Sequence, residues 1–168
     1  DLPLIPFTDD CVAQIAMHCD VVALATSAEV SHAWAPALLQ TGVKVLDLSG
    51  AFRLSNSHEY AKYYKMTHKH PALLSQAVYG LPEWYAEDIA RADLIAAPGC
   101  YATAAILALK PMVHLATDAP IAVMGTSGAS GAGRQAKLAL NTCELSLQAY
   151  GALQHKHQPE IQQYVGHP

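Results

Sequence analysis

Short apolar runs that alternate with a helical pattern are the feature that most restricts the fold of this 168-residue chain. Residues 21–26 and 43–48 are two such runs, and residues 30–40 between them carry apolar side chains at helical spacing. A third apolar run, residues 93–97, ends in a Pro-Gly pair. The runs at residues 43–48 and 93–97 are apolar enough to be buried on both faces, as strands of parallel sheets are. The pattern therefore predicts an α/β protein built on a parallel sheet.

Other segments predict the elements that surround these strands. A helix is expected over residues 57–64, with Ser57 as its N-cap, and another over residues 102–109. Residues 74–82 predict a loop or a short extended piece. The apolar residues 121–125 predict a fourth strand, which leads into a Gly-rich segment.

The order of these elements suggests two units. We expect residues 1–99 to complete a parallel-sheet domain and residues 100–168 to begin a second domain. The sequence opens without Met in a loop-like stretch and stops just after a helical pattern, so we expect a fragment of a larger protein. Charged residues make up 14% of the chain, against a typical value of about 25%. A partner subunit or another part of the same chain is therefore expected to cover much of the surface.

Composition argues against several classes of partner. The net charge is −4 and the basic residues form no stripe, which argues against nucleic acid. The apolar stretches are far shorter than the roughly 18 to 20 residues that span a bilayer, which argues against a membrane protein. The cysteines and histidines lack the close pairs of a structural metal site. We therefore expect reduced thiols in a cytosolic protein, with Cys11 and Cys19 in the core.

Cys100 lies at the most informative position in the chain. It follows a predicted strand and a Pro-Gly turn, and it opens a predicted helix. The helix macrodipole and the free backbone N–H groups of a first turn favour a thiolate, which is the nucleophilic form of cysteine. The same N–H groups could hold an oxyanion when the thiolate attacks a carbonyl. The alternative is a small buried residue that packs the helix against the sheet.

Two His-x-His segments could place imidazoles near such a thiol. If residues 155–157 are extended, His155 and His157 share one face, and either could serve as a general acid or base. A solvated His-rich turn is the alternative. The second segment, His68 to His70, has no supporting context, and we expect it at the surface.

Two further features suggest an anionic ligand. The Gly-rich segment 127–134 follows a predicted strand, as loops that bind phosphates do, although a tight turn would use the same glycines. Arg53 comes just after a predicted strand, at the edge where open α/β sheets bind ligands. Its guanidinium could pair with a carboxylate or a phosphate, and a surface salt bridge is the alternative.

Together these segments resemble the N-acetyl-gamma-glutamyl-phosphate reductases, a family related to aspartate-semialdehyde dehydrogenases. The resemblance extends over nearly the whole chain, in family order, at residues 24–31, 47–53, 79–83, 98–103, 127–134 and 155–161. It implies a fragment of a Rossmann-like NADP-binding domain, followed by the start of an α+β catalytic and dimerisation domain. It also implies NADPH-dependent reduction of an acyl phosphate to an aldehyde, with release of phosphate.

The resemblance also implies roles for particular residues. Cys100 would form a thioester, and His155 or His157 would be the acid/base; spacing does not decide between them, and we favour His155. Arg53 and Glu160 would bind the substrate. The residues implied in binding NADP are Thr26, Ser127, Gly128, Gly131 and Gly133. We expect a homo-oligomer in the cytoplasm that acts on a small acyl phosphate.

Two other functions remain open at this point. A cysteine hydrolase or acyltransferase would use Cys100 with His155 or His157 but would transfer no hydride. A catalytically inactive structural fragment would use none of these residues for chemistry. The reaction product separates the first alternative from the reductase, because a reductase consumes NADPH and a hydrolase releases the free acid.

Overall fold

The computed structural model describes residue 8 and residues 11–115, 120–132 and 146–166. Its centre is a four-stranded sheet of β1 (Val21–Leu24), β2 (Lys44–Asp47), β3 (Val78–Tyr79) and β4 (Leu94–Ala96). The strands are all parallel, in the order β1-β2-β4-β3. The predicted α/β fold with a parallel sheet is thus confirmed.

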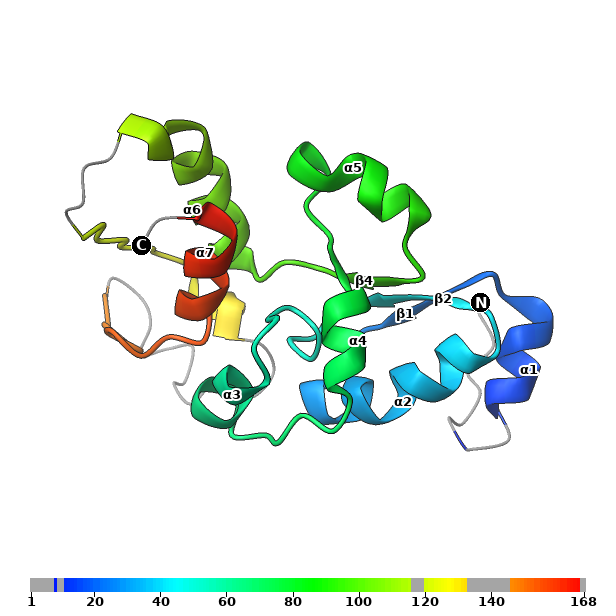
Figure 1. Cartoon of the computed structure of the whole chain (residues 1–168). Helices are drawn as coiled ribbons and strands as arrows, with labels where there is room; N and C mark the ends of the chain where they lie inside the picture. Colours follow the sequence, from blue (N-terminus) through cyan, green and yellow to red (C-terminus); the bar gives the residue numbers. More distant parts are fainter. Residues whose placement is uncertain (1–7, 9–10, 116–119, 133–145, 167–168) are drawn as a thin grey trace.

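Helices connect and cover the strands. The helices that precede β4 in the chain are α1 (Cys11–His18), α2 (Ala28–Gln40), α3 (Ser57–Glu59), α4 (Pro71–Gln76) and α5 (Pro82–Arg91). After β4 come α6 (Cys100–Leu109) and α7 (Gln158–Val165), which lie side by side away from the sheet (Figure 1). Short non-α helical turns follow α3 at Tyr60–Tyr64 and α6 at Lys110–Leu115, and another spans Ala129–Ala132.

Two apolar clusters hold these elements together. The first joins the sheet to α2 and to the loop after β2, through residues such as Leu38, Val45 and Phe52. The second joins the end of the sheet to α6 and α7, through Tyr79 and Ile106 among others. α6 can serve this second cluster because its sequence, CYATAAILAL, is apolar on nearly every side. The clusters meet at the carboxyl ends of the strands, where the loops after β2 and β4 lie.

Several local predictions need correction. The helix that starts at residue 57 is capped by Asn56, whose side chain accepts a hydrogen bond from the His58 N–H at 3.0 Å, and not by Ser57. Residues 121–125 are exposed, and none of the described strands pairs with them, so the predicted fourth strand is wrong there. Cys11 is buried as expected, but Cys19 is exposed. An apolar run forms a strand only where a partner strand is available for its backbone groups.

The His68 segment is not at the surface, which is a further correction. The ring of His68 is buried and lies 4.5 Å from the ring of His32, and the His70 ring lies 4.8 Å from His32, centroid to centroid. His68 Nε2 bonds to the Ala51 carbonyl at 3.1 Å, while its Nδ1 accepts the His70 N–H at 3.3 Å. His32 Nε2 accepts the Lys69 N–H at 2.9 Å. Each accepting nitrogen must carry no proton, so these contacts require neutral imidazoles at His32 and His68.

This cluster predicts a loss of stability in acid. Burial and the neighbouring His32 lower the pKa of His68 to about 4. The unfolded chain binds a proton at an ordinary histidine pKa of about 6.5, so acid favours the unfolded state between those two values. The unfolding free energy of the wild type should fall between pH 6.5 and pH 4, and we expect His68→Gln to make this fall smaller. The difference in slope corresponds to at most about one bound proton. Denaturant unfolding at several pH values measures it, with the exposed His58→Gln as a matched control that leaves the slope unchanged.

Candidate functional site

Cys100 begins α6 directly after the turn that follows β4. Gly99 is the N-cap of the helix and is buried, whereas the Cys100 side chain is exposed and its thiol is free. The turn is held by the Ala97 N–H, which donates to the Asp47 carbonyl at 2.8 Å, and by the Thr103 hydroxyl, which donates to the Gly99 carbonyl at 3.0 Å. The predicted helix start is confirmed, and exposure of the side chain contradicts the packing alternative. A thiol here meets the positive end of a ten-residue helix.

His155 and His157 both lie at this turn. Their rings are 4.7 Å apart, and the Tyr101 ring meets them edge-on at 5.6 Å and 6.1 Å. The segment is a turn, not an extended strand, and the His157 N–H donates to His155 Nδ1 at 3.2 Å. The two imidazoles nevertheless come together, which the sequence predicted only for an extended segment.

Contact between Gly99 and His157 brings α7 onto the turn that precedes Cys100. A Cβ added to Gly99 would lie 2.7 Å from His157 Cδ2 and Cε1, and closer still to Nε2. The imidazole therefore lies directly against the Gly99 backbone, and only a glycine leaves room for it. The helix start that carries the thiol and the turn that carries the histidines are packed against one another here.

Both histidines are neutral near pH 7. Burial, followed by the charges of His155 and Arg53, lowers the pKa of His157 to about 4. Burial also lowers the pKa of His155, with a smaller contribution from Lys156. A neutral imidazole can accept a proton from a thiol or another acid. His157 Nδ1 is buried and has no hydrogen-bond partner among the described residues.

Arg53 and Glu160 form a buried pair beside the turn. Arg53 Nε donates to the Ala97 carbonyl at 2.7 Å, and its Nη2 donates to the Leu48 carbonyl at 3.1 Å. Arg53 Nη1 lies 3.8 Å from Glu160 Oε2. Both side chains are buried, with exposed fractions of 8% and 0%, so the alternative of a surface salt bridge for Arg53 is wrong. Their substrate-binding role stays a prediction.

Tyr79 is a site residue to which the sequence assigned no role. Its hydroxyl donates to Glu160 Oε1 at 2.7 Å, and the Gly99 N–H donates to the same oxygen at 2.8 Å. The Tyr79 ring stacks on that of Tyr164 from α7, with centroids 3.5 Å apart. The only signal in the sequence was its place in a Tyr-Gly-Leu-Pro segment that contributes to the resemblance.

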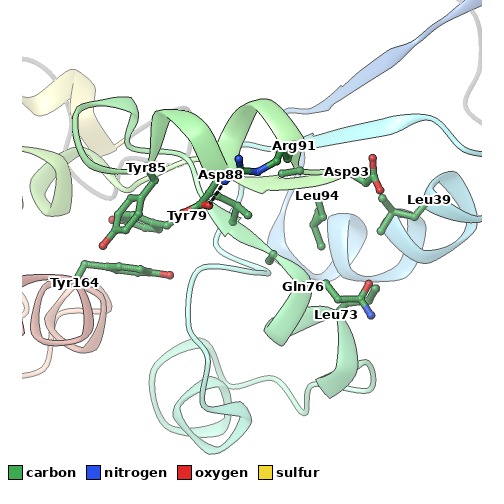
Figure 2. Close-up of a pocket in the computed structure, with 13 residues that line it drawn as sticks. Leu39, Leu73, Gln76, Tyr79, Tyr85, Asp88, Arg91, Asp93, Leu94 and Tyr164 are labelled. Atoms are coloured by element: carbon green, nitrogen blue, oxygen red, sulfur yellow. Dashed lines mark hydrogen bonds and ion pairs between the residues drawn. The ribbon is translucent and has the colours of Figure 1, made fainter.

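The Tyr79 and Tyr164 rings also line a pocket of about 700 Å³. Figure 2 shows Tyr164 facing Tyr79 and Tyr85 at one end of this pocket, with Asp93 and Leu94 toward the other. Neither Cys100 nor the two histidines line it. Cys100 is thus not among the residues that line this pocket.

The structure brings the chain that leads into the Gly-rich segment to the site. A Cβ added to Gly125 would lie 2.8 Å from the Tyr101 ring, so the chain leading into this segment passes beside Tyr101. Ser127 is exposed, and its hydroxyl donates to the Gly128 carbonyl at 3.0 Å. Gly131 lies against the Ser127 hydroxyl, while Gly133 is outside the described residues.

Thr26 lies just beyond the carboxyl end of β1. Its hydroxyl shares a hydrogen bond of 2.9 Å with that of Ser31 in α2. Residues 25–27 are exposed just before α2 begins. The carboxyl end of a parallel strand followed by a helix N-terminus is where α/β sheets bind phosphates and dinucleotides.

Comparison with protein families matches both parts of the chain. Residues 5–92 match the NAD binding domain of semialdehyde dehydrogenase, and residues 100–167 match the dimerisation domain of the same enzymes. The chain belongs to the semialdehyde dehydrogenase family. The family resemblance drawn from the sequence is therefore confirmed.

Curated relatives carry one name. The chain is 52% identical over 169 residues to an N-acetyl-gamma-glutamyl-phosphate reductase of Pseudoalteromonas atlantica, covering 99% of this chain and 49% of the relative. It is 54% identical to the reductase of Yersinia pseudotuberculosis, covering 100% and 51%, and 50% identical to that of Escherichia coli K12, covering 99% and 50%. The chain thus spans about half the length of these relatives. None of the helices in the described part of the chain is long and apolar enough to cross a membrane.

The contact at Gly99 gives a direct test of the site geometry. We expect Gly99→Ala to lower the free energy of unfolding by about 1–3 kcal/mol, because the new methyl group must displace the His157 ring or the turn. Gly128→Ala is the control, since its Cβ would meet nothing closer than the Ser130 hydroxyl at 3.7 Å. Denaturant unfolding measures both. A Gly99→Ala variant as stable as the control would show that the ring does not rest on this glycine.

Proposed function

We propose that this chain carries the nucleophile and the acid/base of an NADPH-dependent acyl-phosphate reductase, which converts N-acetyl-gamma-glutamyl phosphate to N-acetylglutamate semialdehyde and phosphate. The observation that carries the proposal is an exposed cysteine at a helix N-terminus, with two neutral histidines packed at its turn. The name shared by the relatives supports the choice of substrate.

The chain's own residues account for the acyl transfer. The Cys100 thiolate attacks the acyl carbon, the bond from that carbon to the phosphate oxygen breaks, and phosphate leaves with the bonding electrons. Backbone N–H groups at the start of α6 stabilise the oxyanion formed on the way. The product of this step is a thioester on Cys100.

NADPH, when bound, supplies the hydride that reduces the thioester carbonyl. The chain offers an exposed Thr26 hydroxyl just after β1, at the sheet edge where a dinucleotide would lie. Ser127 adds a second exposed hydroxyl, with glycines at positions 128 and 131 beside it in the chain, while Gly133 lies outside the described residues. The resulting tetrahedral carbon loses the Cys100 sulfur, which leaves as the thiolate, and the aldehyde departs. The matched NAD binding domain supports the use of this class of cofactor.

We assign the proton transfers to His157 rather than to His155. The Gly99 backbone fixes the His157 ring in place, and burial keeps the ring neutral, so it can take the thiol proton. It can then protonate the oxygen of the tetrahedral intermediate and take that proton back as the aldehyde carbonyl forms and the thiolate leaves. The His155 ring instead packs edge-on against the rings of Tyr101 and Tyr150. Spacing in the sequence did not decide between the two histidines, and the preference for His155 was made without knowledge of either contact.

We infer further that the protein works as an assembly of identical subunits in the cytoplasm. The match of residues 100–167 to a dimerisation domain and the low fraction of charged residues, 14%, support the assembly. The free thiols of Cys19 and Cys100 support a reducing compartment. No nucleic acid or membrane partner is proposed.

Loss of the nucleophile gives the first test. With the whole protein, we expect NADP reduction that requires both N-acetylglutamate semialdehyde and phosphate, and we expect Cys100→Ser to lower kcat by at least about 10³-fold because a serine hydroxyl is a far weaker nucleophile. Absorbance at the NADPH band measures both. Release of the free acid from the acyl phosphate, without consumption of NADPH, would instead support a cysteine hydrolase. A serine variant with unchanged kcat would show that Cys100 takes no part in the chemistry.

Matched substitutions distinguish the roles of the two histidines. We expect His157→Asn to lower kcat by about 10²-fold or more, as loss of a general acid/base does, and His155→Asn to lower it by less than about tenfold. Asparagine keeps a polar group at each position while removing the titratable nitrogen. The same assay measures both variants, and a larger loss for His155→Asn would reverse the assignment.

A further inference from the structure

Glu160 and Asp47 are the two fully buried carboxylates of the described chain. The Glu160 carboxylate meets groups from three other parts of the fold. Oε1 accepts the Tyr79 hydroxyl from β3 and the Gly99 N–H from the turn before α6, at 2.7 Å and 2.8 Å. Oε2 lies 3.8 Å from the Arg53 guanidinium. A buried carboxylate held in this way is far more costly to remove than one at a surface.

Glu160 and His157 approach the same residue from one face of the first turn of α7. His157 is the N-cap of the helix and Glu160 lies three residues later, a spacing that places two side chains on one helix face. The His157 ring lies against the Gly99 backbone, and the Glu160 carboxylate binds the Gly99 N–H. Gly99 immediately precedes Cys100. Two side chains of one helix turn therefore fix the residue that leads into the nucleophile.

A direct contact between Glu160 and substrate fits these observations poorly. The carboxylate has no exposed surface, and Oε1 already accepts two hydrogen bonds. Its negative charge would repel an acyl phosphate, and the guanidinium beside it donates its Nε and Nη2 hydrogens to backbone carbonyls. The carboxylate can act on the reaction only through the backbone that it holds.

We propose that Glu160 is a positioning residue that fixes the Gly99–Cys100 turn relative to His157, so that the thiol and the imidazole stay within reach of each other. Arg53 balances the buried charge and ties the same turn to the end of β2 through the Ala97 and Leu48 carbonyls. Tyr79 orients the carboxylate from the opposite side. The expected effect of Glu160 on kcat rests on the proposed function, whereas its expected effect on the stability of the Gly99–Cys100 turn does not.

The test uses the whole protein with Glu160→Ala, Glu160→Gln and a matched control, Gln162→Ala. Gln162 lies on the same helix, and its side chain is exposed. Glutamine at 160 keeps an oxygen that can accept the Gly99 N–H, whereas alanine keeps none. The two variants therefore separate loss of the negative charge from loss of the hydrogen-bond acceptor.

Two readouts are independent of each other. Hydrogen exchange at Gly99, followed by mass spectrometry with residue-level fragmentation, should be at least about tenfold faster in Glu160→Ala and closer to wild type in Glu160→Gln, with no change in the control. In the reductase assay, Glu160→Ala should lower kcat at least about tenfold while the KM for the acyl substrate changes less than about threefold, and Glu160→Gln should restore part of the loss. A substrate ligand would raise KM instead.

The outcomes distinguish the two proposals. Faster exchange at Gly99 in a protein with no reductase activity would overturn the proposed function and leave the role of Glu160 in holding the turn. Unchanged exchange and unchanged kcat in a folded Glu160→Ala variant would overturn the positioning role. If the alanine variant does not fold, Tyr79→Phe takes its place, because it keeps the ring stack and removes only the hydroxyl that orients the carboxylate. Like Glu160→Ala, it should accelerate exchange at Gly99 and lower kcat. Wild-type values for both would overturn the proposal.

Discussion

Burying a carboxylate beside a guanidinium costs several kcal/mol of desolvation for each ion, and neighbouring hydrogen bonds must offset that cost. In this chain the offset comes from backbone groups at the ends of strands. Arg53 donates to carbonyls that follow β2 and β4, and Glu160 accepts the N–H of the residue before Cys100. The ions are stable only when these three segments lie together. The pair therefore couples the end of the sheet to α7, and the arrangement of the site depends on it.

Sheet order explains why these segments can meet. β2 and β4 are neighbours in the sheet although α3, α4, β3 and α5 lie between them in the chain. Parallel neighbours end at the same edge, so the loop that carries Arg53 and the turn that carries Cys100 leave the sheet side by side. β3 adds Tyr79 at the same level, opposite Ala96. Only α7 must be brought from far along the chain, and the second apolar cluster packs it against α6.

The sequence predicted what depends on local pattern and missed what depends on distant packing. The strands and the helix start at Cys100 are encoded by apolar runs and a Pro-Gly turn, and the structure contains them. Residues 121–125 carry an equally apolar run, yet a strand also needs a neighbour, and none of the described strands pairs with it. His68 looked like a surface histidine because the rings that enclose it, those of His32 and Tyr60, come from other parts of the chain. The burial of Glu160 was hidden for the same reason, since its three partners lie far away in sequence.

Near Cys100, the backbone supplies positive potential and the neutral His157 ring supplies a proton acceptor. Burial, with His155 and Arg53 nearby, holds the pKa of His157 near 4, so this ring carries no charge at neutral pH and adds no fixed positive charge beside the thiol. The peptide N–H groups at the start of α6 do provide positive potential, and they do so at every pH at which the helix is folded. The backbone can therefore stabilise a thiolate or an oxyanion while the neutral imidazole remains able to accept a proton. Both functions require the ring to lie close to the helix start, which is the contact that the missing side chain of Gly99 permits.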